Sequence, residues 1–593
     1  MNVGHVHERR IGFMATMGNI SRRGLLSSTV AVAAAAATGI TGSGTASVAS
    51  RWTAAGTATA TALPAPAGAA EIPTLWTEFL RNRYNHPQIP WVGTAGYGHG
   101  SRKRPHPRVR ANVLHDGARP DGSADAAPVI NAAIERVGRA GGGTVLIPPG
   151  TYRIDDIIRI GHDNVVLRGA GSGRTVLHAT RSLEEIIGIN RSRYGNSPNS
   201  SWSWSGGLVW LCPKDRYEAL TGAIKAQNWP FEGWTGNDAN EAVPLTDIVA
   251  PAARGDFTVT VADASRLRPG ARVMLQLDDD TEHSLLAAMC GDVDGTATYT
   301  WSDKTKLLSY APFNWPVRIA SVHGRRVRLA QPLPLPVRAG WRPRISGVPH
   351  LMTGSGVEGI TIDLVKTVRP KHLQDKGYNG LVMQCTWDCW ADDIHVVNGD
   401  NGFLLVSAKG CTMSRTRASG RGYHHSYACR EQSHDNLVTD FAIDAFTEVP
   451  TPGSGHHGIN VEGLSCGNVW SRGRVDAGTF DSHRGLPFGN VRTEVTILND
   501  GAHGGSADAG PLYGARFAHW NVTVTNERAG CVKIDEVAPY SATVAISTVR
   551  PFGQIDKPDF TGDLYSRLEA YGTPGAGPGR PRNLYEAQRA LVG

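Results

Sequence analysis

The stretch HHGINVEGLSCGN (residues 456–468) aligns without a gap with HHSYACREQSHDN (424–436) upstream and GTFDSHRGLPFGN (478–490) downstream. The offsets are 32 and 22 residues, and two further stretches, NGLVMQCTWDC (379–389) and NGFLLVSAKGC (401–411), are again 22 apart. A period of about 22 residues is typical of a solenoid, in which each repeat forms one coil and stacks on its neighbours. Short Val-, Ile- and Thr-rich segments between polar turns favour strands over long helices. We therefore expect an all-β solenoid.

A motif near the start of the coils specifies the kind of solenoid. Residues 113–154 contain GARPDGSADAAPVINAAIERV followed by GGGTVLIPPGTY. This motif closely resembles the N-terminal signature of the pectate-lyase superfamily, whose members are right-handed parallel β-helices. The resemblance implies the fold but not the reaction, because the superfamily includes lyases, hydrolases, transferases and phage tailspikes. Apolar residues at helical spacing from Pro128 to Val137 predict a helix that caps the open N-terminal end of the solenoid.

The N-terminus carries an export motif rather than fold. SRRGLLSSTVAVAAAAATGITG, with Arg22 and Arg23 before an Ala-rich run, resembles a twin-arginine signal, and SVAS (47–50) suits cleavage after Ala49. The run is too short and too polar for a membrane span. We expect a secreted protein, the alternative being a disordered basic leader. Removal of residues 1–50 lowers the formal charge from +7 to +4, which is too weakly basic for a nucleic-acid-binding surface.

Composition and texture divide the chain into six segments. Tryptophan is concentrated in SWSWSGGLVW and NWPFEGWTGND, and the texture after them suggests antiparallel strands. We expect a twin-arginine signal peptide (1–50), a linker and N-terminal segment (51–110), first coils with the cap and a Trp-rich segment (111–245), an inserted β module (246–345), main coils (346–548) and a C-terminal tail (549–593).

Equivalent residues of successive coils stack about 4.8 Å apart, and alternate residues of a strand face opposite sides. The alignment predicts inward-facing pairs at Leu404/Val406, Tyr427/Cys429 and Ile459/Val461. It also predicts four stacked columns: Ser407, Arg430, Glu462 and Arg484; Ala428, Asn460 and Ser482; Cys389, Cys411 and Cys466; and Asn436, Asn468 and Asn490. The first places Glu462 between two guanidinium groups, and the last is typical of a structural Asn ladder. Asp481 and His483 fall on the inward face, which indicates either a strand end or a polar pocket.

The polar columns suggest chemistry on an acidic glycan. A lyase needs a cation to neutralise a uronate carboxylate and a base to remove the C5 proton, roles that suit arginine and histidine. Our candidate catalytic residues are His483, Arg484, Arg430, Glu462, Asp481 and His457. Our candidate substrate-binding residues are His425, Asn460, Trp202, Trp204 and Trp234, since sugar rings stack on exposed aromatic faces. The alternative for the tryptophans is that they seal the Trp-rich segment against the coils.

The best interpretation is a secreted polysaccharide lyase acting by β-elimination. A glycoside hydrolase using Glu462 and Asp481, or a glycan-transferring enzyme, is an alternative. A non-catalytic carbohydrate-binding solenoid with an ion-pair ladder is a third. We predict no cofactor and no metal site, although a divalent cation such as calcium stays open, as does a metal bound by His425, His457 and Asp481. The expected partner is a polysaccharide, with no nucleic acid and no membrane span, and the oligomeric state is open.

Overall fold

The computed structural model describes residues 72–101, 103–190, 202–227, 242–301, 312–348, 351–449, 451–526, 532–546, 558–569 and 581–592. The predicted signal peptide and the candidate residue Trp234 lie outside these residues.

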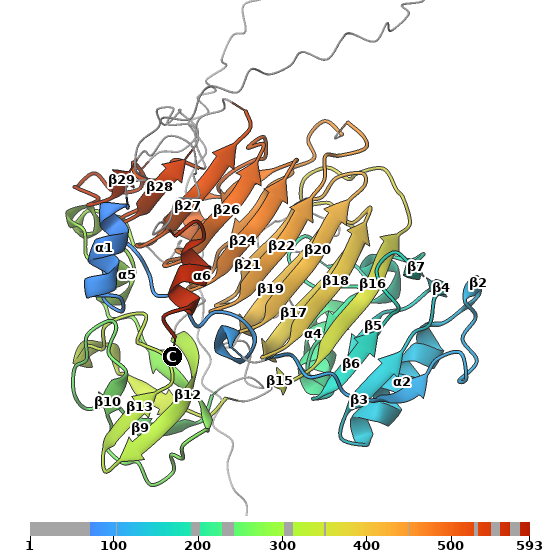
Figure 1. The fold of residues 1–593 in the computed structure, drawn as a ribbon, viewed down its shortest axis with the longest axis horizontal. Helices are drawn as coiled ribbons and strands as arrows, with labels where there is room; N and C mark the ends of the chain where they lie inside the picture. Colours follow the sequence, from blue (N-terminus) through green and yellow to red (C-terminus); the bar gives the residue numbers. More distant parts are fainter. Residues whose placement is uncertain are drawn as a thin grey trace, which may run out of the picture. The chain divides into compact units, whose positions relative to one another are not determined.

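Two parallel sheets wind together into a right-handed parallel β-helix, which confirms the predicted fold class. The strands of the larger, 15-stranded sheet cross Figure 1 as a row of parallel arrows. They are β1 (Val109–Asn112), β2 (Asp121–Asp125), β3 (Gly143–Leu146), β4 (Gly150–Ile154), β6 (Val165–Arg168), β7 (Thr175–Ala179), β16 (Gly356–Leu364), β18 (Trp390–Val397), β20 (Thr412–Ser419), β22 (Leu437–Ile443), β24 (Val469–Val475), β26 (Val491–Ile497), β27 (Ala518–Val524), β28 (Ala542–Ile546) and β29 (Arg567–Glu569). The 8-stranded sheet holds β5 (Ile158–Ile160), β8 (Val209–Leu211), β15 (Met352–Thr353), β17 (Asn379–Trp387), β19 (Asn401–Lys409), β21 (His425–Arg430), β23 (Gly458–Val461) and β25 (Thr479–Ser482).

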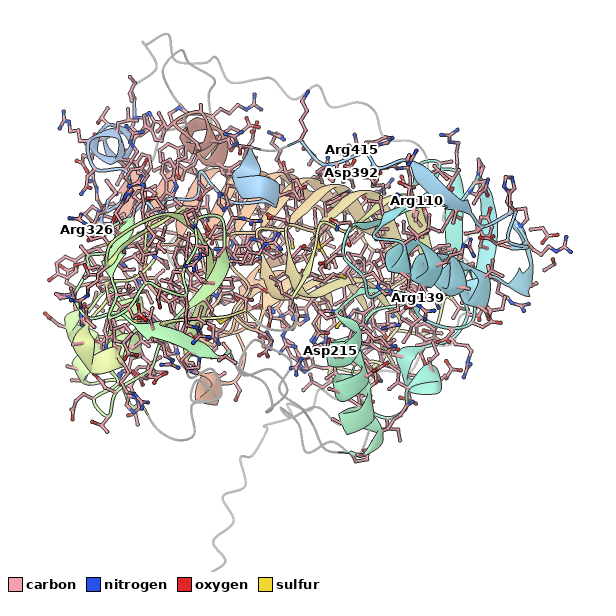
Figure 2. All side chains as sticks on the ribbon, turned by 90° about the horizontal axis from the view of Figure 1, so that it is seen from below. Arg110, Arg139, Asp215, Arg326, Asp392 and Arg415 are labelled. Carbon is pink, nitrogen blue, oxygen red and sulfur yellow. The ribbon has the colours of Figure 1, made fainter. Side chains whose placement is uncertain are left out.

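Strand alternation explains why these segments form coils. In β18 the side chains of Ala391, Ile394 and Val396 are buried in the core between the sheets, while the residues between them are more exposed. On the outer face, opposite charges from neighbouring coils meet: a guanidinium nitrogen of Arg415 in β20 lies 2.5 Å from a carboxylate oxygen of Asp392 in β18. Figure 2 labels both residues. Exposed pairs of this kind contribute little to stability, so burial of the inward-facing side chains holds the coils together.

The Asn ladder is confirmed. Asn436 donates from Nδ2 to Oδ1 of Asn468 at 2.9 Å, and Asn468 donates to Oδ1 of Asn490 at 3.0 Å. Each amide also donates to or accepts from the backbone of the turn, so the ladder satisfies groups that the sharp turn would leave buried without partners.

The predicted cysteine column is wrong for one member. Cys411 follows Cys389 in the next coil, but its backbone N–H donates to Oδ1 of Asn436, so that column continues into the Asn ladder. Cys466 instead stacks between His434 and Phe488 and packs against the inserted module. The cause is an error of two residues in the alignment of the earlier coils with the later ones: Cys411 is at the level of Asn436 and not of His434. All seven cysteines of the described residues are buried.

The predicted register is also wrong by one residue on both sides of β21 and β23. Phe403, not Leu404, pairs with Tyr427 on the inward side. Ile459 pairs with Phe480, so Phe480 is the inward residue of β25 and Asp481 faces outward beside Asn460. The turn after β25 absorbs the extra residue with left-handed backbone at Arg484, Gly485 and Leu486. Asp481 and His483 were therefore assigned to the inward, apolar column only because the alignment did not allow for the extra residue in this turn.

Helix α2 (Ala127–Arg139) caps the N-terminal coils, as predicted. Its Ile130, Ala133, Ile134 and Val137 are fully buried or nearly so, and they pack in the same core as the coils. The other helical elements are α1 (Thr74–Arg81), α3 (Leu183–Ile186), α4 (Lys214–Lys225), α5 (Ser284–Met289), α6 (Leu584–Arg589), η1 (Tyr97–Gly100), η3 (Asp294–Ala297), η5 (Ala339–Trp341) and η6 (Ala507–Ala509).

The segment between the two runs of coils forms a separate antiparallel sheet with its own core. Its strands are β9 (Pro244–Asp247), β10 (Thr258–Thr260), β11 (Arg272–Leu277), β12 (Phe313–His323), β13 (Arg326–Leu329) and β14 (Arg344–Ser346), drawn in green in Figure 1. The core of this module includes Leu464, Leu486 and Phe488 from turns of the β-helix, so it is packed against the coils by apolar side chains.

The first and last described helices, α1 and α6, pack against the coils. Leu75 and Phe79 of α1 are fully buried in one cluster with Trp520, Val544 and, from α6, Leu584. Strand β29 pairs with β28, so the expected C-terminal tail contributes one further strand to the larger sheet. No helix in the described part of the chain has the length and apolar character needed to cross a bilayer.

Candidate active site

A cavity of about 530 Å³ opens beside the last strands of the 8-stranded sheet. Connections between coils form its rim, and the side chains of the repeat form its floor. The polar and aromatic residues in its lining are Trp204, His372, Ser454, His457, Glu462, His483 and Ser506. Four residues that we selected from the sequence line this one cavity: the catalytic candidates His457, Glu462 and His483, and the substrate-binding candidate Trp204.

Five histidine rings gather at this cavity. The ring of His425 stacks on those of His424 and His457, with ring centroids 4.4 and 4.8 Å apart. The centroid of His483 lies 4.9 Å from that of His457, and His372 lies 4.9 Å from His424. The indole of Trp204 covers the group, 4.8 Å from His483 and 5.0 Å from His425. The histidines meet because they lie at or near the ends of strands β17, β21, β23 and β25, which belong to the same parallel sheet.

Asp481 holds His483 in place from behind. Its carboxylate accepts a hydrogen bond from Nδ1 of His483 at 3.1 Å and another from the backbone N–H of Gly504 at 2.8 Å. The backbone N–H of His483 donates to Oδ1 of Asn460 at 3.1 Å. Asp481 is fully buried, whereas the side chain of His483 is 14% exposed. Asp481 therefore positions the ring that faces the cavity.

The cluster is electrostatically divided. Burial disfavours the charged form and holds the pKa of His424 and His425 well below the usual value; it also lowers the pKa of His457. Burial acts on His483 in the same direction, but the Asp481 carboxylate outweighs it and raises the pKa of that ring. Burial would raise the pKa of Asp481, yet the neighbouring His457 and His483 bring it well below its usual value. The cluster thus combines neutral imidazoles with one more basic ring on an ionised carboxylate.

Arg430 forms the predicted pair with Glu462 and is fully engaged by the protein. Its Nε donates to Oε1 of Glu462 at 2.7 Å, and one terminal nitrogen donates to Oε1 of Glu431 at 2.9 Å. The other terminal nitrogen donates to the backbone carbonyl of Trp204, and the guanidinium lies 5.1 Å from the centroid of that indole. With 1% of its surface exposed, Arg430 fixes the cavity wall and presents no open fork to a substrate carboxylate.

Arg484 does not join this group. It donates to Oδ1 of Asp559 at 2.9 Å and to the backbone carbonyl of Gly505 at 3.1 Å. The prediction that Glu462 lies between two guanidinium groups is therefore wrong, because the one-residue shift at β25 turns Arg484 toward the C-terminal segment.

Three of the candidate substrate-binding residues lie behind the cavity wall. Trp202 is fully buried, and its indole N–H donates to the carbonyl of Gly188 at 3.2 Å, so it seals the segment against the coils. His425 and Asn460 are also fully buried. Trp204 is 4% exposed and lines the cavity.

Sequence comparison within the repeat missed His372 and Asp375. Both lie in the connection between β16 and β17, where no coil periodicity exists to align them. His372 is tied by its backbone N–H to the carbonyl of Gly453, at 2.8 Å, in the connection between β22 and β23. Asp375 is 1% exposed and binds Nδ1 of His424 at 2.9 Å. The concentration of polar and charged residues in this connection, VKTVRPKHLQDKGY (365–378), was the available signal.

The winding of the sheets, the capping helix and the cavity at the coil connections define a parallel β-helix of the pectate-lyase type. A family model described as rhamnogalacturonase A/epimerase, pectate lyase-like, matches residues 110–208. This match and the observed winding of the coils support the pectin-lyase-like superfamily of right-handed parallel β-helices, with no subfamily specified.

Two curated relatives come from Azotobacter vinelandii. Mannuronan C5-epimerase AlgE6 is 41% identical over 97 residues, which is 15% of this chain and 11% of that protein. Alginate lyase 7 is 41% identical over 91 residues, 14% of this chain and 11% of that protein. The match thus spans only about a tenth of either relative. Among solved structures, the tailspike protein gp49 from Pseudomonas phage LKA1 has a TM-score of 0.38 at 12% identity, covering 78% of this chain and 74% of that one.

Proposed function

We propose that this protein is an exported enzyme that removes the C5 proton from a uronic-acid unit of a polysaccharide, with β-elimination as the outcome. The observation that carries the proposal is the His483–Asp481 pair, in which a buried carboxylate supports a ring on the wall of the 530 Å³ cavity. The family and the names of the two relatives, which are an epimerase and a lyase of uronate polymers, support the same substrate class.

His483 is the proposed base. Its Nδ1 is occupied by Asp481, and its Nε2 lies 3.2 Å from the point that a Cβ on the cavity-lining Gly505 would occupy. A positioned imidazole whose pKa is raised by a carboxylate is a stronger base than free histidine once deprotonated. The indole of Trp204 beside it offers an apolar face for a sugar ring.

The proposed reaction begins when Nε2 of His483 takes the C5 proton. The C5–H electron pair first remains on C5 as a carbanion. In elimination this pair forms the C4–C5 double bond while the C4–O4 bond breaks with its electrons on O4. The leaving O4 takes up one proton, which balances the proton taken up by His483. If the same carbanion is instead reprotonated at C5 from the opposite face, the product is the C5 epimer, the second candidate outcome favoured by the match to mannuronan C5-epimerases.

The hydrolase alternative is less well supported by the geometry. An inverting pair needs a carboxylate that activates a water, and a retaining pair needs one that attacks the sugar. Asp481 is fully buried behind His483, and Glu462 is bound to Arg430.

The test uses the full chain with polymannuronate, polyguluronate and polygalacturonate in deuterated and ordinary water. Elimination is read from the ultraviolet absorbance of unsaturated uronate, and epimerisation from deuterium at C5 by NMR. We expect His483→Ala to lower the rate roughly 10²-fold or more. His456→Ala is the matched control, because His456 is next to His457 in the connection before β23 but contacts Asp500 at 3.9 Å. Release of reducing ends with neither unsaturation nor deuterium at C5 would overturn the proposal.

A further inference from the structure

Three histidines on one side of the cavity are close enough to bind a single ion. His372, His424 and His457 each offer a ring nitrogen, and these three nitrogens all lie within 4.8 Å of one another. They come from three separate connections, before β17, β21 and β23, so the winding of the coils brings them together. His372 and His457 line the cavity, and His424 lies behind them.

The orientation of the buried rings leaves Nε2 free at each. Nδ1 of His424 is 2.9 Å from Oδ2 of Asp375, and Nδ1 of His457 is 3.3 Å from Oδ2 of Asp481. Nε2 of both rings is buried and has no hydrogen-bond partner among the described residues, although the rings are 0% and 4% exposed. A buried polar nitrogen without a partner is destabilising, so its retention points to a ligand.

The third nitrogen faces the same space. Nε2 of His372 and Nε2 of His457 each lie 3.5 Å from the point that a Cβ on Gly455 would occupy. The absence of a side chain at Gly455 keeps that space open between the two rings. Tetrahedral ligation at 2.0–2.1 Å places such nitrogens about 3.4 Å apart, which small ring movements would achieve from the present separations.

We propose that Nε2 of His372, His424 and His457 bind one divalent transition-metal cation of the zinc type, with its remaining position open to the cavity. Three imidazoles with an open position are the ligand set of catalytic zinc sites. Imidazole favours zinc and its neighbours over calcium or magnesium, which prefer oxygen ligands. Asp375 would orient the ring of His424 through its hydrogen bond to Nδ1, which is the usual outer arrangement around metal-bound histidine. The carboxylate of Asp481 lies 3.3 Å from Nδ1 of His457, within an ion-pair contact of that ring.

The role of this cation rests on the proposed function, whereas its binding does not. Removal of a C5 proton requires neutralisation of the adjacent carboxylate, and the guanidinium of Arg430 is already occupied by Glu462, Glu431 and the carbonyl of Trp204. A cation bound by His457, whose ring centroid lies 4.9 Å from that of His483, would polarise the substrate carboxylate as a Lewis acid while His483 takes the proton.

A second arrangement competes for the same ion. His425, His457, Asp481 and His483 also place four ligand atoms within 4.8 Å of one another, with His457 common to both sets. In that arrangement Asp481 and His483 would be ligands and His483 could not act as the base. His372 belongs to the proposed site alone, and its exposed position makes it replaceable without loss of fold.

The experiment measures metal binding by the purified, untagged full chain after treatment with a chelator. Zinc binding is followed by calorimetry and by metal analysis after dialysis, and cobalt by its visible absorption. We expect one zinc ion per chain. His372→Ala should weaken zinc binding by more than the roughly 10- to 100-fold that loss of an outer partner causes, and Asp375→Asn should weaken it within that range. His456→Ala should bind zinc like the unmodified protein.

Two outcomes overturn the inference. If His372→Ala binds zinc as tightly as the unmodified chain, the ion is at the His425 set or elsewhere. If the unmodified chain binds no zinc or cobalt, the three histidines are not a metal site. Circular dichroism verifies that each variant is folded. Because binding is measured without substrate, its failure would leave the proposed uronate chemistry standing, and an inactive chain that binds zinc would refute only the proposed function.

Discussion

Replacing Arg430 by alanine should destabilise the protein by about 3–5 kcal/mol, the range typical when one partner of a buried ion pair is removed. The side chains of the pair with Glu462 are 1% and 8% exposed, and those of the pair with Glu431 are 1% and 2% exposed. Loss of the guanidinium would leave both carboxylates buried without a cation and the carbonyl of Trp204 without its donor.

A matched variant separates charge from packing. Arg430→Met keeps most of the apolar stem, so it should recover only the part of the loss that comes from the cavity. Arg136→Ala is the surface control, because the pair of Arg136 with Asp116 has side chains 54% and 28% exposed, and such pairs contribute about 0–1 kcal/mol.

The assay is urea denaturation followed by tryptophan fluorescence, to which Trp204 beside the guanidinium contributes a local signal. The reasoning would be refuted if Arg430→Ala and Arg136→Ala shift the unfolding free energy equally, within about 0.5 kcal/mol. The reasoning would also be refuted if Arg430→Met were as stable as the unmodified chain, because burial of the two carboxylates without a cation would then have no energetic cost.

Four further changes test other parts of the structure. Glu462→Gln should retain measurable elimination, because Glu462 orients Arg430; a loss of more than roughly 10² in the rate of unsaturated-product formation would instead make it a catalytic carboxylate. Asn468→Ala interrupts the Asn ladder and leaves buried turn groups unpaired, so urea denaturation should show a loss of about 1–3 kcal/mol or more. Gly473→Ala places a Cβ 2.1 Å from the ring of Phe441, and overpacking should cost about 1–3 kcal/mol in the same assay. Leu486→Ala, at the fully buried contact between the coils and the inserted module, should cost about 2–5 kcal/mol and increase proteolysis of the module; an unchanged digestion pattern would show that the module is held by other contacts.

The repeat, the cap and the Asn ladder could be predicted from the sequence because they depend on local periodicity. Each coil repeats the same alternation of apolar and polar residues, and Asn436, Asn468 and Asn490 recur at the same position in three successive turns. The pairing of Arg430 with Glu462 followed from the same alignment, since equivalent residues of adjacent coils lie one strand spacing apart.

Tertiary structure alone decided the register at β25 and hence the site. One extra residue in a strand reverses every side chain that follows, and sequence alignment cannot tell in which turn that residue is absorbed. The shift turned Asp481 outward beneath His483 and sent Arg484 to Asp559. His372 and Asp375 reach the cavity from a connection without periodicity, so their contacts depend on the path of a loop and not on the repeat. Local pattern thus determined the coils, whereas contacts between residues distant in sequence determined which side chains meet in the cavity.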